Sequence, residues 1–210
     1  MNRRMALTGA GAAVLAAGLV GVLFATGALG GGDRSALEAK KICGDMDYAS
    51  QAKAFQRVVP DDGGDVGTDS SVRGRPEDHE WTSRCLLSLD GENALLIDSR
   101  LVLTTPENWQ RNLWSREIAD GKDLKKVDLG ARALSTPNSF ALLVSCTSED
   151  RSNRPLQLSV AVTAQGEART DDGARRQDLA DIGVRAAQLA DAETGCKPAE
   201  ALPKTAPEVK

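Results

Sequence analysis

The chain has 210 residues, and its 26 Lys and Arg against 30 Asp and Glu give a formal net charge of −4. Residues 1–34 hold three basic groups and one acid, which leaves 23 − 29 = −6 for the remainder and excludes a general nucleic-acid binder, since such proteins carry a clustered basic excess. One histidine excludes a multi-histidine metal site, four cysteines are too few for a disulfide-dense mini-scaffold, and an apolar fraction of 41% excludes wholesale disorder.

The N-terminal segment, residues 1–34, predicts a signal anchor. Two arginines precede an uncharged, apolar run over residues 5–29, which is longer than the roughly 20 residues that span a bilayer core as a helix. The apolar region of a cleaved signal peptide is usually about 7–15 residues long, so an uncleaved transmembrane helix is the favoured interpretation and a cleaved signal the alternative. Basic residues only before the run predict residues 35–210 outside the cell membrane. We expect a single-pass membrane protein, or a secreted one if the segment is cleaved.

Export changes what the cysteines indicate. Cys43, Cys85, Cys146 and Cys196 lack the close spacing of a zinc site or a redox pair, so they predict two structural disulfides in an oxidising compartment. Four cysteines allow three connectivities, and the sequence alone does not select one. We predict Cys43–Cys85 and Cys146–Cys196, because each bridge would tie a helix end to a strand within its own half of the outer domain.

The first half of the outer domain (residues 35–196) predicts a helix, a loop and a β-hairpin. A helical apolar pattern ends at Pro60, and residues 60–80 are polar and without periodicity, which predicts a long loop. Two apolar runs on either side of Asp90-Gly91, together residues 81–104, are typical of an antiparallel hairpin with a tight turn.

A further helix is predicted from Pro106 to about residue 120, because proline suits the first helical position and Glu107 complements the positive end of a helix. Trp109 and Trp114 are five positions apart on it, which is about 140° of rotation at 3.6 residues per turn. Both rings can therefore flank one apolar face, and core packing is the favoured interpretation. If a ring is exposed instead, it is the candidate partner-binding side chain.

The second half repeats part of this layout. Alternating apolar residues over 127–133 predict an edge strand, and runs over 140–147 and 156–164 predict a second strand pair. A helix begins at Asp171-Asp172. Two related halves are one interpretation of this repeat, and unrelated halves are the other. Antiparallel hairpins with separate helices indicate the α+β class, and residues 197–210, with three prolines, predict a disordered tail.

Three short motifs surround the cysteines: Cys43-Gly44 opens a helix, Trp81 shortly precedes Cys85 in a strand, and Gly195-Cys196 is a terminal Gly-Cys pair. With these motifs the chain resembles a broad group of secreted or membrane-anchored actinomycete proteins with two cysteine pairs. The resemblance implies an envelope location and paired cysteines. It assigns no catalytic residue.

Residues suited to catalysis are sparse. The sequence has no phosphate-binding glycine-rich loop before a helix and no Gly-x-Ser-x-Gly motif, and His79 lies among acidic residues in the polar loop, which is typical of a solvated histidine. We predict no catalytic residue, no cofactor and no metal ligand. A carboxylate hydrolase is the enzymatic alternative, with a pair drawn from Asp90, Glu92 and Asp98, and it needs two acids about 5–10 Å apart across a cleft.

Together these features predict a non-enzymatic module that is held in the membrane by residues 5–29 and binds a partner or ligand at the cell envelope. Its partner is an envelope protein or ligand rather than nucleic acid. A carboxylate-based hydrolase of the envelope and a purely structural envelope protein are the alternatives.

Overall fold

The computed structural model describes residue 43 and residues 49–59, 65–114, 123–149, 155–166 and 170–209. Its elements are, in chain order, η1 (Ala49–Gln51), α3 (Ala52–Val58), β1 (Val66–Arg73), η2 (Pro76–Asp78), β2 (Thr82–Leu89), β3 (Glu92–Leu103), α4 (Pro106–Trp114), β4 (Lys125–Val127), β5 (Arg132–Ser135), β6 (Ser139–Glu149), β7 (Pro155–Ala164) and α5 (Asp172–Thr194). The predicted transmembrane segment lies outside the described residues. Among the helices that are described, none is both long enough and apolar enough to cross a membrane.

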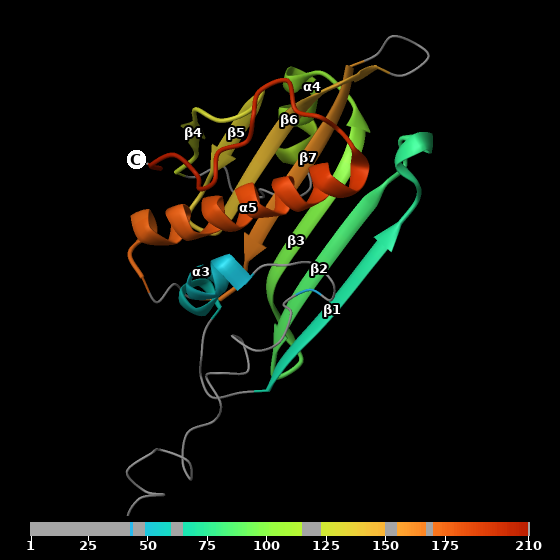
Figure 1. The fold of residues 1–210 in the computed structure, drawn as a ribbon. Helices are drawn as coiled ribbons and strands as arrows, with labels where there is room; N and C mark the ends of the chain where they lie inside the picture. The colour runs from blue at the N-terminus through green and yellow to red at the C-terminus, as the bar shows by residue number, and fades with distance from the viewer. Residues whose placement is uncertain are drawn as a thin grey trace, which may run out of the picture. The chain divides into compact units, whose positions relative to one another are not determined.

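Seven strands form one antiparallel sheet in the order β1-β2-β3-β7-β6-β5-β4 (Figure 1). The chain builds it as two meanders, β1 to β3 and β4 to β7, which meet where β3 pairs with β7 from Leu95↔Ala164 to Leu103↔Leu156. The hairpin predicted around Asp90-Gly91 is β2 and β3, and the second predicted pair is β6 and β7. The α+β class is therefore confirmed.

The long helix α5 covers one face of the sheet (Figure 1). It begins where predicted, because the Asp171 side chain at the N-cap accepts the Ala174 N–H at 2.9 Å, and it ends at Gly195, whose φ of 61° is left-handed. Alternate residues of the central strands, such as Ile97 and Val160, are fully buried beneath it.

The shorter helix α4 packs on the opposite face. Trp109 contacts Leu134, Ala141 and Leu143, whereas the residues next to these along β5 and β6 face α5. A twofold axis that exchanges the antiparallel neighbours β3 and β7 runs perpendicular to the sheet, so it would keep both helices on one face. Helices on opposite faces give no support to the interpretation of two related halves.

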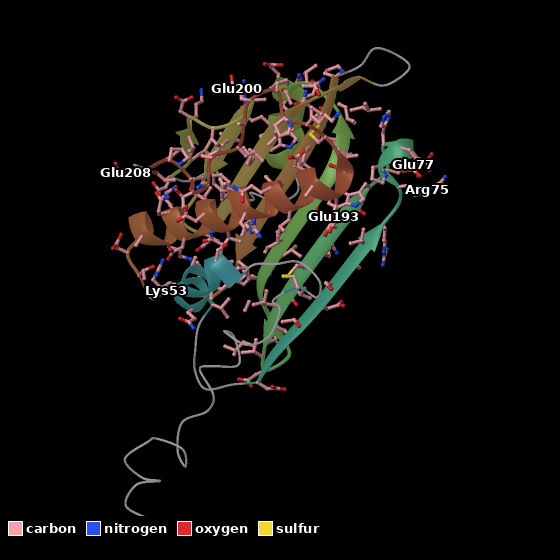
Figure 2. All side chains as sticks on the ribbon, in the orientation of Figure 1. Lys53, Arg75, Glu77, Glu193, Glu200 and Glu208 are labelled. Atoms are coloured by element: carbon pink, nitrogen blue, oxygen red, sulfur yellow. A yellow bond between two sulfur atoms is a disulfide. The ribbon has the colours of Figure 1, made fainter. Side chains whose placement is uncertain are left out.

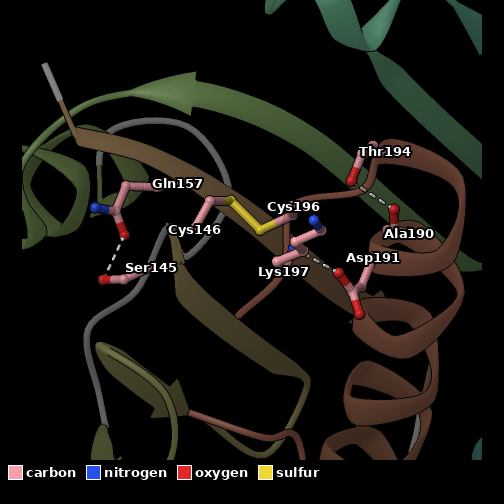
Figure 3. Close-up of a disulfide and its surroundings, with 8 residues drawn as sticks. All are labelled: Ser145, Cys146, Gln157, Ala190, Asp191, Thr194, Cys196 and Lys197. Atoms are coloured by element: carbon pink, nitrogen blue, oxygen red, sulfur yellow. Dashed lines mark hydrogen bonds between the residues drawn. A yellow bond between two sulfur atoms is a disulfide. The ribbon is translucent and has the colours of Figure 1, made fainter. Parts of the chain in front are cut away.

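Both predicted disulfides are confirmed. Cys43 is bonded to Cys85 in β2, and Cys146 in β6 is bonded to Cys196, immediately after the C-cap of α5 (Figure 3). Around the second bridge the chain after α5 runs beside β6, because the Thr147 N–H donates to the Lys197 carbonyl oxygen at 3.0 Å. The bridge thus fixes the end of the last helix to the sheet.

The prediction of a long loop over residues 60–80 is wrong, because residues 66–73 form the edge strand β1 and residues 76–78 form η2. Most side chains of β1 are exposed. The strand therefore lacks the alternation of apolar and polar residues by which a half-buried strand is predicted from sequence. Hydrogen bonds to β2, in register from Val66↔Leu89 to Arg73↔Thr82, hold the strand instead. The predicted edge strand over residues 127–133 is likewise two short strands, β4 and β5.

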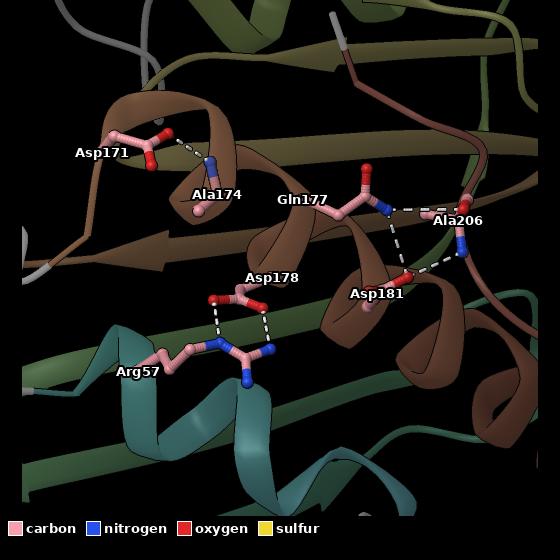
Figure 4. A network of polar contacts seen from close by, with 7 residues as sticks. All are labelled: Arg57, Asp171, Ala174, Gln177, Asp178, Asp181 and Ala206. Atoms are coloured by element: carbon pink, nitrogen blue, oxygen red, sulfur yellow. Dashed lines mark hydrogen bonds and ion pairs between the residues drawn. The ribbon is translucent and has the colours of Figure 1, made fainter.

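The prediction of a disordered tail is wrong for residues 197–209, which pack along α5 (Figures 1 and 4). Ala206 and Val209 are buried, the Asp181 carboxylate accepts the Ala206 N–H at 2.9 Å, and Gln177 accepts the Val209 N–H at 3.0 Å. The segment starts with a bridge between Pro198 and Cys146 of β6, and polar side chains of α5 then bond its extended backbone.

Two aspartates on neighbouring turns of α5 have different surroundings (Figure 4). Asp178 is buried and receives a bidentate hydrogen bond from Arg57 of α3, at 2.8 Å from Nε and 2.5 Å from Nη2. Asp181 receives neutral donors, the Ala206 N–H and the Gln177 amide. Burial raises the pKa of the Asp181 carboxyl above its ordinary value, although these hydrogen bonds act in the opposite direction.

This contrast predicts opposite effects for one chemical change. Asp178→Asn should lower the free energy of unfolding at neutral pH by about 2 kcal/mol, because an amide cannot accept both guanidinium hydrogen bonds. Asp181→Asn should leave stability equal to or above that of the wild type, because it keeps an acceptor for Ala206 and removes the cost of burying a charge. Urea denaturation of both variants measures the effects.

The pH dependence follows from the raised pKa of Asp181. The folded protein holds the proton of the Asp181 carboxyl more tightly than the unfolded chain does. Protonation of Asp181 therefore stabilises the fold as the pH falls through the pKa of the folded state. This gain in stability is complete below the pKa of the unfolded state. Any advantage of Asp181→Asn over the wild type should therefore shrink as the pH falls through that window. Equal losses for both variants would contradict the assignment.

Candidate functional site

Of the acids considered for a hydrolase, Asp90 and Glu92 lie at the β2–β3 turn and Asp98 lies within β3. Asp90 lies in the β2–β3 turn with a φ of 51°, and its carboxylate accepts the Asp65 N–H at 3.0 Å. Glu92 begins β3, and Asp98 follows six residues later, about 20 Å along a strand at roughly 3.3 Å per residue. Asp98 is already in ion pairs with arginines. Asp98 is therefore too far from Glu92 to form a catalytic pair with it, and the Asp90 carboxylate is bonded to the backbone at the turn.

Trp109 is 5% exposed, and its indole Nε1–H donates to Ser159 Oγ at 2.8 Å. The ring therefore lies in the core beneath α4, which is the interpretation that the sequence favours. Because it is buried, it is not a partner-binding anchor. The side chain of Trp114 lies outside the described part of the chain. His79 ends η2 in a left-handed conformation with a φ of 59°, where it serves as the helix C-cap.

A surface on β1, β2 and β3 emerges instead on the side of the sheet away from α5. Residues directly opposite each other in antiparallel strands point to the same side, so the register Ser71↔Arg84↔Asp98 defines one row across this surface. The cluster beneath α4 contains residues of β5 and β6 and reaches the end of β3 at Val102, beyond this row. We call this surface the open face; its residues are Asp69, Ser71, Arg73, Thr82, Arg84, Leu86, Leu96, Asp98 and Arg100.

Charges at the centre of the open face form a chain of ion pairs. The Arg84 guanidinium lies 3.5 Å from one oxygen of Asp98, and Arg100 lies 3.8 Å from the other oxygen. The Arg84 side chain is 61% exposed, whereas that of Asp98 is 17% exposed. Arg84 and Arg100 thus share the carboxylate of Asp98, within residues 35–210, whose formal charge is negative.

The same surface offers apolar contact. Leu86 and Leu96 are direct cross-strand partners, and both are half-buried beside the ion pairs. Arginine next to apolar side chains is a composition enriched in protein interfaces, and a guanidinium has five N–H donors, more than one carboxylate can use. Because the side chains stand on paired strands, little backbone order has to be gained on binding.

A hollow of about 360 Å³ lies at the turn between β4 and β5 and is lined by residues 126–133. Its arginine, Arg132, is already held by α4, through a hydrogen bond to Gln110 and an ion pair with Glu107 at 3.5 Å. Within the described ranges no three His, Cys, Asp or Glu side chains come together as metal ligands. The open face is therefore the better candidate for binding.

The sequence indicates Asp98 only as a candidate catalytic acid, and it does not single out Arg84 or Arg100 as binding residues. The available signal was their alternation with apolar residues inside the two predicted strands, which places all charged members on one side. Register decides which of them meet, and no local pattern supplies it.

No protein-family model matches the chain, and no match is found among curated proteins or solved structures. Its own residues are therefore the basis for a functional proposal.

Proposed function

We propose that the chain is a non-enzymatic binding module of the cell envelope, anchored by residues 5–29 and with its outer domain contacting an acidic partner protein through the open face. The observation that carries this proposal is Arg84, which is 61% exposed and paired with Asp98 on the side of the sheet away from α5. Two disulfides support an oxidising compartment.

The chemistry of the open face favours a carboxylate-bearing partner. Asp98 forms an ion pair with Arg84 at 3.5 Å. This ion pair orients the guanidinium and leaves some of its N–H donors unused. A partner carboxylate can accept the remaining N–H groups in bidentate geometry, and the adjacent leucines provide apolar contact. An acidic surface is also the kind that the exposed guanidinium of Arg84 attracts during encounter.

Photo-crosslinking in intact cells tests the proposal. A photoreactive amino acid at position 84 should give a discrete adduct with one envelope protein, and the same amino acid at Glu193 should not, because Glu193 is exposed on α5 (Figure 2). Protease added outside wall-less cells should remove the adduct if residues 35–210 are outside. Absence of an adduct from position 84, or identical adducts from both positions, would overturn the open face as the binding surface.

A further inference from the structure

The edge strand β1 has an outer side that no described residue pairs with. The Asp90 N–H donates to the Asp65 carbonyl oxygen at 3.0 Å, which makes Asp65↔Asp90 a hydrogen-bonded pair of the β1–β2 ladder. Hydrogen-bonded and non-hydrogen-bonded pairs alternate in antiparallel strands. The backbone groups that point away from β2 therefore belong to the even-numbered residues of β1, which are Val66, Thr68, Ser70 and Val72.

This edge lacks the usual protection against pairing. Natural edge strands carry lysine, proline or a bulge that discourages another strand, and β1 has none of these over its eight residues, in an unbroken register with β2. Val72, 54% exposed, is the one large exposed apolar side chain among the described residues. Its two charges, Asp69 and Arg73, are opposite in sign and four residues apart.

We propose that two copies of the chain associate through β1, antiparallel, about a twofold axis at Ser71. In this register Asp69 of each copy is directly opposite Arg73 of the other, and Ser70 is opposite Val72. Ser70 and Val72 exchange backbone hydrogen bonds through their outward groups. Asp69 and Arg73 then form non-hydrogen-bonded pairs, in which side chains are closest and opposite charges stabilise most.

Charge selects this register over its neighbours. Moving the axis to Ser70 places Asp69 opposite Ser71 and Arg73 opposite Gly67, which pairs no charges. Moving it to Asp69 places Arg73 opposite Asp65, which precedes β1, but it also places two aspartates directly opposite each other, and that is unfavourable. The axis at Ser71 satisfies four charges at once, and it brings the two exposed Val72 side chains to diagonal positions on the other side of the strand.

The consequence is one continuous sheet through two copies, in which each open face continues into the next. This inference does not rest on the proposed partner binding, since it uses the edge of β1 and not Arg84. A second copy is favoured over a foreign strand because the strand is complementary to itself, and a foreign strand is an outcome of the test.

Sedimentation equilibrium of the full chain in density-matched detergent tests the proposal through a charge swap. Wild-type protein should be a dimer, and Arg73→Asp or Asp69→Arg alone should weaken dimerisation roughly tenfold or more. The double variant D69R/R73D should restore it, because the opposed charges are exchanged. Lys53→Asp, the same charge change at an exposed site on α3, is the matched control and should remain dimeric.

A crosslink checks the position of the axis. Ser71→Cys should form a disulfide between copies, whereas Ser70→Cys should not, because only residue 71 is opposite itself. A wild-type monomer at all soluble concentrations, or a monomer that recruits a foreign strand, would overturn the proposal. So would a dimer that survives both single charge reversals, or a double variant that is not restored.

Discussion

Replacing Cys146 and Cys196 together with serine should lower the free energy of unfolding by about 4 kcal/mol. The two cysteines are 50 positions apart, and the loss of loop-closure entropy in the unfolded chain grows with the logarithm of that length. Denaturation in urea under conditions that keep Cys43–Cys85 oxidised measures the change. A loss below about 1 kcal/mol would indicate that the unfolded state stays compact without the bridge.

The structural consequence should be local to the last part of the chain. The bridge lies where the chain leaves α5 (Figure 3). The Thr147 N–H donates to Lys197 and the Ala199 N–H donates to Ser145 in the same region. Amide exchange should therefore rise over residues 198–209 in this double variant. The matched control removes Cys43 and Cys85, which are 42 positions apart and thus similar in loop entropy, and should leave exchange in that region unchanged.

Gly183→Ala should lower the free energy of unfolding by about 2 kcal/mol, although alanine is the better helix former. A Cβ at this position would lie 2.4 Å from Cδ1 and 2.7 Å from Cε1 of Phe140, which is fully buried in β6. Neither the ring nor the helix has free space to move into. The overpacking penalty of about 1–3 kcal/mol should therefore exceed the propensity gain of at most about 1 kcal/mol.

A double-mutant cycle identifies the cause. Phe140→Leu removes the ring atoms in conflict, so Gly183→Ala should be much less destabilising in the Phe140→Leu background than in the wild type. Thermal and urea unfolding of the four proteins give the coupling energy. If Gly183→Ala stabilises the wild-type protein, as it would on an exposed helix face, α5 does not approach β6 as closely as described.

The sequence by itself determined the elements whose signals are local. Alternation around Asp90-Gly91 predicted β2 and β3, and Asp171 marked the start of α5, because N-capping depends on residues within one turn. The cysteine pairing was predicted from the order of those elements, and the structure selects it among the three connectivities that the sequence leaves open. The predicted membrane anchor also rests on a local run, and it stays a prediction.

Only the tertiary structure decided β1, the tail and the open face. The strand β1 is polar because little of it is buried, and its order comes from the partner strand β2. Residues 197–209 are ordered by side chains of α5 that precede them in the sequence. Arg84, Asp98 and Arg100 meet because of strand register. In each case the stabilising contacts come from residues distant in the chain, and a local pattern carries no record of such contacts.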